Sequence, residues 1–312
     1  LSSVYLDLES PLLYDQTGFK MQKDASQLKA QLAQDNRLLV ENVTNKIEKK
    51  KAPLLFNLAE LQAECSKLFK ISPDKTLEIA QALYEAKLTT YPRTDARVLS
   101  AAVADVIEDN LEGLTKGQYH ADIAEKIILQ NMYDGLSKSK YTDDSKITDH
   151  YAIIPTGETD VSRLNDLQLS VYKLITNRFL SIFYPPAEYN KTEILLKHSN
   201  GEHFYASEKI LEKTGWMEIT GTNDEKTASI HGIHKGDILN TEFSIKNGQT
   251  SPPTRYTSGS IILAMENAGK LIEDEDLRAE IQGKGIGTSA TRADTIKKLI
   301  KIGYITLDSI PP

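Results

Sequence analysis

The residue best suited to nucleophilic chemistry in this sequence is Tyr91, which lies in the string Thr-Tyr-Pro-Arg-Thr-Asp at positions 90–95. A phenol is a weak nucleophile at neutral pH because its pKa is about 10. Nearby cations can favour the phenolate and can hold a phosphate group for attack. Lys87 precedes Tyr91, while Arg93 and Arg97 follow it, and the planar guanidinium of an arginine grips two phosphate oxygens. This spacing is compatible with attack on a phosphate group, but considered alone a tyrosine beside an arginine is more often part of an ordinary surface.

A second candidate is His150, which precedes the apolar string Ala-Ile-Ile-Pro-Thr at positions 152–156. A histidine titrates near neutral pH, so its ring can donate a hydrogen bond to phosphate or relay a proton. The same pattern is also typical of a structural or surface histidine. Taken alone, this string leaves both interpretations open.

Two later strings could bind phosphate through backbone amides, hydroxyls and arginine. Residues 285–292 read Gly-Ile-Gly-Thr-Ser-Ala-Thr-Arg and precede a predicted helix. Free amides and the positive end of the helix dipole favour an anion at such a position. Arg255 lies in the other string, Pro-Pro-Thr-Arg-Tyr-Thr at positions 252–257. Considered alone, the first string also fits an ordinary turn, and the second fits a helix entry with an N-cap.

Hydrophobic periodicity predicts the elements that position these residues. Tyr91 follows a predicted helix that ends near Lys87, and Pro92 disfavours helical backbone at the residue before it. Tyr91 is therefore expected on an extended segment just past a helix end. The predicted helices are 25–34, 58–87 in two parts with Pro73 at the start of the second, 97–114, 121–136, 165–183, 260–268 and 290–302. The predicted strands are 3–8, 38–46, 191–196, 202–206 and 237–245, with the basic run 46–51 as a solvated connector.

The order of these elements predicts a multidomain α+β protein. A β-rich arch domain, residues 1–56 and 184–250, is interrupted by a helical domain, residues 57–183, that carries Tyr91. A partial helical domain is expected over residues 251–312. Pro-Pro pairs at both ends of the second β-rich piece support these boundaries.

Composition limits the classes of protein that fit. Hydrophobic residues make up 40% and charged residues 26%, which is ordinary for a globular protein. No apolar run approaches the roughly 18 residues of a membrane span, and no signal peptide is visible. The net charge of −7 counts mildly against a nucleic-acid partner, although such binding depends on local basic clusters. The single cysteine, Cys65, cannot form an internal disulfide, so we predict an intracellular protein.

Taken together, the strings resemble those of type IA DNA topoisomerases, in particular the bacterial topoisomerase III branch. The string at 88–95 is similar to the active-site signature of that family, and 149–156 is similar to its His-x-Ala-Ile-x-Pro-Thr motif. Residues 252–257 and 285–293 resemble two later family segments, and all four strings occur in the family order.

Three positions depart from the family pattern. Ala96 stands where the family usually has Ser or Cys, Tyr151 where it commonly has a second His, and Ser258 where it has an acidic residue. Each departure changes one side chain and leaves the neighbouring Tyr, Arg, His and Asp residues in place. The departures therefore weaken single positions and not the resemblance as a whole.

The resemblance implies a role for each matched residue. Tyr91 would be the nucleophile, Arg93 would stabilise the transition state, and His150 would hydrogen-bond near the scissile phosphate. The implied DNA-binding residues are Asp95, Arg97, Arg255, Thr288, Ser289, Thr291 and Arg292. The family fold is an open toroid, in which an N-terminal Toprim domain binds Mg²⁺. This sequence has no matching segment, and no metal site is expected within it, because the acidic run 273–276 is typical of a solvated loop.

The implied activity is relaxation or decatenation of DNA without ATP. Tyr91 would cleave one strand, stay attached through a 5′-phosphotyrosyl bond, and reseal the break after strand passage. We expect this sequence alone not to relax supercoiled DNA, because the metal-binding half of the family's site is missing from it. The expected partner is single-stranded DNA and not a membrane, and the protein is expected to be a monomer in the bacterial cytoplasm, associated with the nucleoid.

Two other functions fit parts of the sequence. A non-catalytic module could bind single-stranded DNA through Arg93, Arg255 and residues 288–292 without cleaving it. A helical transcriptional regulator with a winged-helix unit would account for residues 290–305. That second alternative leaves the Tyr91 and His150 strings unexplained.

Overall fold

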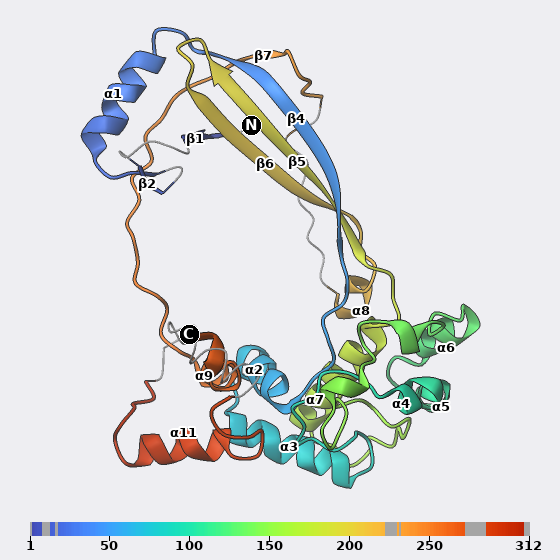
Figure 1. Ribbon diagram of the computed structural model, residues 1–312. Helices are drawn as coiled ribbons and strands as arrows, with labels where there is room; N and C mark the ends of the chain where they lie inside the picture. The colour runs from blue at the N-terminus through green and yellow to red at the C-terminus, as the bar shows by residue number, and fades with distance from the viewer. Residues whose placement is uncertain are drawn as a thin grey trace. The chain divides into compact units, whose positions relative to one another are not determined.

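Contacts between residues divide the chain into two compact units (Figure 1). The first unit comprises residues 1–51 and 186–253, and the second comprises residues 52–185 and 254–312. The structure, a computed structural model, describes residues 2–7, 13–15, 18–221, 230, 232–271 and 285–308. The acidic run at 273–276, predicted to be a solvated loop, lies outside these residues. The division into three domains stays a prediction.

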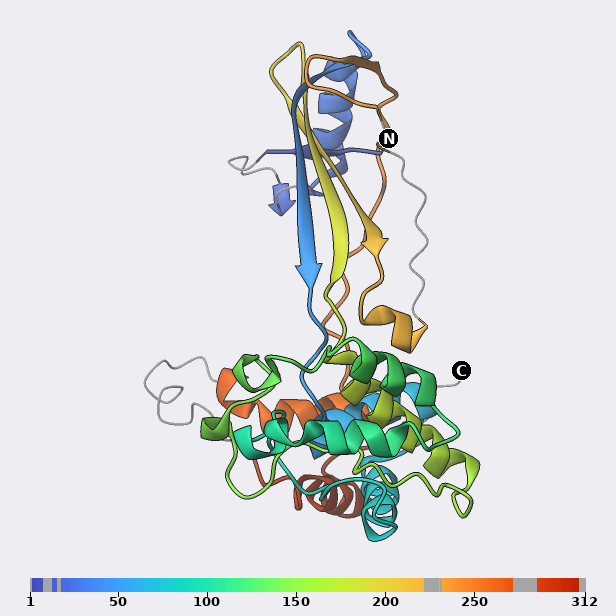
Figure 2. The ribbon, with the colours of Figure 1, turned by 90° about the vertical axis from the view of Figure 1, so that its right-hand side faces the viewer.

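The first unit is built on an antiparallel sheet. Its elements are β1 (Val4–Leu6), β2 (Leu13–Asp15), β3 (Gly18–Phe19), α1 (Gln22–Leu32), β4 (Arg37–Lys50), β5 (Ala187–His198), β6 (His203–Lys213), α8 (Met217–Thr220) and β7 (Ile238–Asn240). Five strands pair in the order β1-β6-β5-β4-β7, and β2 pairs with β3 separately. Figure 2 shows β4, β5 and β6 as long ribbons side by side, with α1 beside one end of them.

The apolar core of the first unit lies at one end of this sheet. Leu38 and Val40 of β4 are buried and pack with Ile194, Leu196 and Phe204 of the two neighbouring strands. The side chains alternate between the two faces of each strand, which is the pattern that predicted these strands. Burial therefore fixes the register at this end.

The other end of the sheet carries charged side chains. The basic run at 46–51, predicted to be a connector, instead forms the end of β4 up to Lys50. This prediction was wrong because the backbone of the run pairs with β5, from Lys46 opposite Lys191 to Lys50 opposite Ala187, and Glu188 supplies a counter-charge to Lys49. A charged segment can therefore be a strand without apolar alternation when its partners supply the counter-charges.

The second unit is helical. Its α-helices are α2 (Leu58–Phe69), α3 (Pro73–Glu85), α4 (Ala101–Asp105), α5 (Ile107–Leu114), α6 (Ala121–Leu129), α7 (Asp166–Ser181), α9 (Ser258–Glu266) and α11 (Arg292–Lys301). Short 3-10 helices are η1 (Leu136–Lys138), η2 (Asp144–Lys146) and η3 (Ala268–Leu271). As predicted, α3 begins at Pro73, with Ser72 accepting a hydrogen bond from the backbone N–H of Lys75.

The helix predicted at 97–114 is shorter and divided into α4 and α5. It begins only at Ala101, because the backbone before it pairs elsewhere: the N–H of Leu99 donates to the carbonyl of Tyr141 at 2.8 Å. Ser100 then caps α4 by accepting from the N–H of Val103. This extended stretch continues the segment that carries Tyr91.

A common apolar core joins α2, α3 and α7. Phe56, Leu83, Leu88, Ile153 and Ile175 are all buried in it. Helix α9 packs on α2 so closely that a Cβ at Gly259 would lie 2.8 Å from the Cα of Ala63, and the C-terminal segment thus belongs to the same compact unit. In the part of the chain that the structure describes, no helix has both the length and the apolar character needed to cross a membrane. The predicted α+β class is confirmed.

Candidate active site

The segment that carries Tyr91 begins with a reversal of the chain after α3. Lys87 has a φ of 63°, and the N–H of Leu88 donates to the carbonyl of Leu83 at 2.9 Å, which ends the helix. The chain then leaves the helix, and Thr89 pairs with Pro155 in an antiparallel bridge. Tyr91 lies past the end of α3, outside any helix, as the sequence predicted.

Residues 150–156 run beside this segment and hydrogen-bond to it at several points. The N–H of Thr90 donates to the carbonyl of Ile154 at 2.9 Å, and the Thr90 hydroxyl donates to the carbonyl of Ala152 at 3.0 Å. The Thr94 hydroxyl donates to the carbonyl of His150 at 2.7 Å. Bonds on both sides of Tyr91 therefore fix its backbone and bring it next to His150.

Tyr91, His150 and Tyr84 form a row of rings. The ring centroids of Tyr91 and His150 lie 4.5 Å apart, and those of Tyr84 and Tyr91 lie 5.3 Å apart in an edge-to-face arrangement. Tyr91 is half-buried, whereas His150 is exposed. Two of the three residues predicted to be catalytic are thus brought together.

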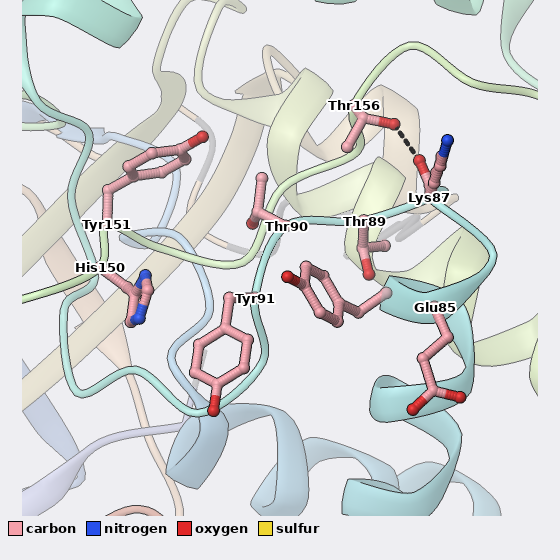
Figure 3. A pocket seen from close by; sticks show the side chains of 9 residues that line it. Glu85, Lys87, Thr89, Thr90, Tyr91, His150, Tyr151 and Thr156 are labelled. Atoms are coloured by element: carbon pink, nitrogen blue, oxygen red, sulfur yellow. Dashed lines mark hydrogen bonds between the residues drawn. The ribbon is translucent and has the colours of Figure 1, made fainter.

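These rings border a pocket of about 540 Å³. Figure 3 shows its wall, to which Glu85, Lys87, Thr89, Thr90, Tyr151 and Thr156 also contribute. Burial raises the pKa of Tyr151, so its phenol keeps its proton and can donate a hydrogen bond. The hydroxyl of Thr156 donates to the carbonyl of Lys87 and closes one edge of the pocket.

Arg93, the third predicted catalytic residue, is half-buried on the same segment. Among the residues that the structure describes, it forms no ion pair. Arg97, by contrast, pairs with Glu60 and donates through Nε to the carbonyl of Leu55 at 3.3 Å. The two arginines therefore differ: Arg93 is available to an anion, while Arg97 holds the segment to the start of α2.

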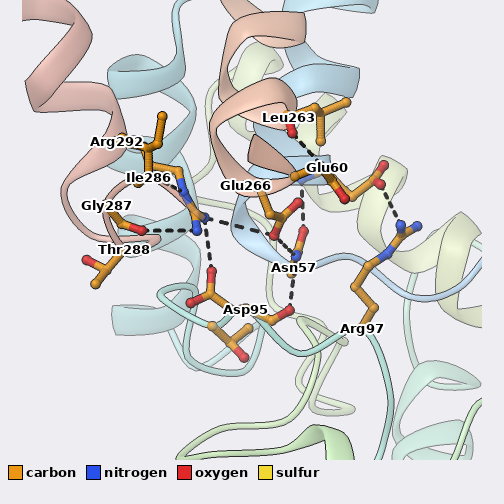
Figure 4. Close-up of polar contacts among 12 residues, drawn as sticks. Asn57, Glu60, Asp95, Arg97, Leu263, Glu266, Ile286, Gly287, Thr288 and Arg292 are labelled. Carbon is orange, nitrogen blue, oxygen red and sulfur yellow. Dashed lines mark hydrogen bonds and ion pairs between the residues drawn. The ribbon is translucent and has the colours of Figure 1, made fainter. Parts of the chain in front are cut away.

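Arg292 lies in a buried polar cluster (Figure 4). Its side chain is only 5% exposed, and Nη1 lies 3.1 Å from Oδ1 of Asp95 and 3.9 Å from Oε1 of Glu266. Nε and Nη2 donate to the carbonyls of Ile286 and Gly287, each at 3.2 Å. All three nitrogens of the guanidinium therefore contact protein groups.

Asn57 links the same cluster to the start of α2. Its side-chain amide donates to Oε1 of Glu266 at 2.6 Å and to the carbonyl of Asp95 at 3.0 Å, while its oxygen caps α2 at the N–H of Glu60. Burial raises the pKa of Glu266, although Arg292 and Asn57 act in the opposite direction. The cluster joins α2, α9, the loop before α11 and the tyrosine segment.

The hydroxyls of the loop before α11 hydrogen-bond to one another. The N–H of Thr288 donates to the Thr291 hydroxyl at 2.9 Å, and the two hydroxyls lie 3.1 Å apart. Both threonines are exposed, while Ser289 is buried. Arg255 is 93% exposed at its side chain and contacts Asp308 at 3.9 Å.

Sequence reasoning did not single out several residues of this site. Glu60 and Glu266 were predicted only as parts of helices, Asn57 only as the residue before one, and Tyr84 and Thr89 were not proposed as site residues. An asparagine before a helical run and a carboxylate on a mostly apolar helix were the available signals for Asn57 and Glu266. Neither signal identifies the partner, because Asn57 and Glu266 lie 209 residues apart in the sequence.

The described residues do not provide a metal site. No group of three or more His, Cys, Asp or Glu side chains within them is arranged to hold a metal ion. Three carboxylates around the tyrosine segment, Glu60, Asp95 and Glu266, are paired with arginines.

Comparison with known proteins identifies the family of this chain. A sequence profile described as DNA topoisomerase matches residues 9–311. The chain belongs to the type IA DNA topoisomerase family. DNA topoisomerase 3 of Bacillus subtilis is 35% identical over 280 residues, which cover 85% of this chain and 38% of that protein. DNA topoisomerase 3 of Shouchella clausii is 35% identical over 87% of this chain and 38% of that protein.

A solved structure shows the same fold. Full-length topoisomerase I from Thermotoga maritima aligns with a TM-score of 0.67 and 23% identity, over 97% of this chain and 47% of that one. The chain thus spans about 38% of the length of the topoisomerase 3 relatives given above. The resemblance seen in the four strings is confirmed at the level of the family.

Proposed function

We propose that this chain carries the strand-cleaving tyrosine of a type IA topoisomerase. Tyr91 attacks a phosphodiester of single-stranded DNA: the bond from its phenolic oxygen to phosphorus forms while the bond from phosphorus to the 3′ oxygen breaks. The phenol gives up a proton, and the 3′ oxygen leaves with one as a hydroxyl. After another strand has passed, the reverse reaction reseals the DNA. No ATP is consumed, because the phosphotyrosyl bond conserves the energy of the phosphodiester.

The observation that supports this proposal most directly is the ring of Tyr91 beside His150 on the wall of a pocket. The hydrogen bonds of Thr90 and Thr94 hold the backbone of Tyr91, so the phenol can be presented with little loss of freedom. Arg93 has no ion-pair partner among the described residues and can hold the phosphate and stabilise its transition-state charge. The imidazole of His150 can donate a hydrogen bond to the phosphate or relay the proton.

The DNA strand binds further along the same unit in this proposal. The exposed hydroxyls of Thr288 and Thr291 and the exposed guanidinium of Arg255 are suited to phosphate oxygens. Direct DNA contacts of Asp95, Arg97, Ser289 and Arg292 stay predictions, and the contacts of Asp95 and Arg292 within the protein support a positioning role. The complete enzyme uses Mg²⁺ in this proposal, held outside the described residues.

The test uses the complete protein of which this chain is a part, with a labelled single-stranded oligonucleotide. Stopping the reaction with denaturant should leave labelled DNA attached to the wild-type protein. Tyr91→Phe should abolish that adduct and keep binding to the strand, because the ring remains and only the hydroxyl is lost. Tyr133→Phe, at another tyrosine of the same unit, should form the adduct as the wild type does.

Two outcomes would contradict the proposal. An adduct that persists in Tyr91→Phe would place the nucleophile elsewhere. Strand binding without any adduct in the wild-type protein would favour the alternative of a non-catalytic single-stranded DNA-binding module.

A further inference from the structure

The pocket beside Tyr91 has more room and more unsatisfied polar capacity than an attack on a phosphate requires. Its volume of about 540 Å³ extends from Tyr91 to Glu85 and Thr156. Thr89 is only 1% exposed, and its hydroxyl has no hydrogen-bond partner among the described residues. Figure 3 shows Thr89 on the wall of the pocket, between Thr90 and Lys87. A buried polar group without a partner is destabilising, so this wall favours a ligand that brings a polar edge.

The ring of Tyr84 is the second unusual feature of the pocket. It is 40% exposed, although it lies beside the buried core residue Leu83 and touches the ring of Tyr91 edge to face. Large exposed rings that border a hollow are suited to stack against flat ligands. The neighbouring polar groups, Thr89, Thr90 and Tyr151, lie around it on the same wall.

The charges on the wall argue against a phosphate deep in the pocket. Lys87 contributes one cation, but the Glu85 carboxylate lies on the same wall. A phosphate is therefore better placed outside the deep part of the pocket, at the Tyr91 hydroxyl to which it becomes joined. The pocket itself suits an uncharged, planar group with hydrogen-bonding edges that is covalently joined to that phosphate.

We propose that this pocket holds the base of the nucleotide whose 5′-phosphate becomes linked to Tyr91, with the ring of Tyr84 as its stacking surface. This inference rests on the proposed function, since it needs DNA at Tyr91. The hydroxyl of Thr89 can donate to or accept from the edge of a base, and the phenol of Tyr151 can donate to an acceptor on it. Every base has a flat face, so the pocket retains the base through stacking and needs no single sequence.

The consequence is that one base near the cleaved bond contributes to binding through Tyr84, while its neighbours do not. Loss of base stacking on an aromatic residue weakens binding by roughly 5- to 150-fold. The effect should appear at a single position of the strand. A contact with the sugar-phosphate backbone alone would not depend on which base is present.

The test measures binding of the complete protein that carries this chain to a short fluorescent oligonucleotide by anisotropy. A series of strands replaces one base at a time by an abasic site and keeps every phosphate. In the wild type, the abasic site at one position should weaken binding several-fold more than at the others. Tyr84→Ala should weaken binding to the intact strand by a similar factor and should lose the dependence on that position. Tyr84→Phe, which keeps the ring, should behave as the wild type.

Controls separate the possible failures. Tyr133→Ala removes another tyrosine of the same unit and should leave binding unchanged, and thermal melting should show that Tyr84→Ala stays folded. If the position effect persists unchanged in Tyr84→Ala, or if Tyr84→Phe loses it, the pocket inference is overturned while DNA binding stands. If the wild type does not bind single strands at all, the proposed function fails first and the pocket inference falls with it.

Discussion

The segment from Tyr91 to Arg97 is held in different ways at its two ends. At the Asp95 end, a guanidinium that is 5% exposed contacts two carboxylates and two carbonyls, and Arg97 pairs with Glu60. At the Tyr91 end, the backbone is hydrogen-bonded, but the side chain borders an open pocket beside two other rings. We call these the Arg292 cluster and the tyrosine pocket.

This difference shows how one short segment can combine a fixed backbone with a reactive side chain. The Arg292 cluster satisfies its polar groups within the protein, so its members gain little from a ligand. The tyrosine pocket leaves a hydroxyl unpaired and rings exposed, so its members gain from one. Fixing the backbone through the first and leaving the side chain open in the second pre-organises the nucleophile. The comparison predicts large stability effects from the cluster and small ones from the pocket.

The largest effect is expected from Arg292→Ala. The variant leaves Glu266 buried without its cation and frees the carbonyls of Ile286 and Gly287. We expect it to lower the free energy of unfolding by about 3 kcal/mol, near the lower end for breaking a buried pair, because Asp95 is 53% exposed. Urea denaturation followed by circular dichroism measures this change.

Arg255→Ala is the matched control for Arg292→Ala. It removes the same side chain from a site that is 93% exposed, and its ion pair with Asp308 at 3.9 Å is exposed as well. We expect a change of at most about 0.5 kcal/mol. Equal losses in the two variants would contradict the contrast between buried cluster and open surface.

A smaller effect is expected from Asp95→Asn. The variant keeps the shape of the side chain and removes the charge that faces Arg292 at 3.1 Å. Because that carboxylate is about half exposed, solvent screens the pair, and we expect a loss of about 0.5–1 kcal/mol. A double-mutant cycle with Arg292→Ala isolates the pair. A coupling energy of zero would mean that the two residues act independently and that Asp95 does not belong to the cluster.

The pH dependence of stability tests whether Glu266 is buried as the cluster requires. Burial raises its pKa, so the folded chain holds the proton more tightly than the unfolded chain does. Its contribution to stability is therefore present below the ordinary pKa of a glutamate, about 4.3, and is lost as the pH rises through the raised pKa. The side chain in Glu266→Gln cannot titrate, so the unfolding free energy of this variant should increase relative to that of the wild type as the pH rises.

Unfolding free energies of both proteins, measured from about pH 4 to about pH 7, give this difference directly. A difference that stays constant with pH would show that the pKa of Glu266 is unchanged on folding. A difference of the opposite sign would show that Arg292 and Asn57 outweigh burial.

The smallest effect on stability is expected from Tyr91→Phe. The ring keeps its contacts with Tyr84 and His150, and only the hydroxyl is lost. We expect the free energy of unfolding to change by at most about 0.5 kcal/mol. Thermal melting of both proteins checks this. A loss as large as that of Arg292→Ala would mean that Tyr91 is a structural residue and that the two ends of the segment are alike.

Local signals in the sequence predicted the position of Tyr91 correctly. Pro92 restricts the residue before it, and Ser72 with Pro73 marks a helix start, so both effects act within a few residues. The alternation of Leu38 and Val40 likewise predicted β4 where one face is buried. These features depend on the neighbouring chain and need no knowledge of distant partners.

Features that depend on distant partners could not be predicted in the same way. Arg292 follows a glycine and hydroxyl string that is typical of a phosphate site, yet its nearest carboxylate is Asp95, which lies 197 residues earlier. The end of β4 is a strand because its backbone pairs with β5, where Glu188 also supplies a counter-charge to Lys49. In both cases a residue distant in the sequence determines the structural role, and the local string does not identify that residue.

The central claim is that Tyr91 itself becomes linked to the 5′ end of the cleaved strand. The direct measurement is mass spectrometry of the trapped adduct from the complete protein, after digestion with trypsin and nuclease. Cleavage after Lys87 and Arg93 releases residues 88–93, in which Tyr91 is the only tyrosine. The account predicts a 5′-phosphorylated nucleotide on this peptide. A nucleotide on any other peptide, or one joined through its 3′-phosphate, would contradict it.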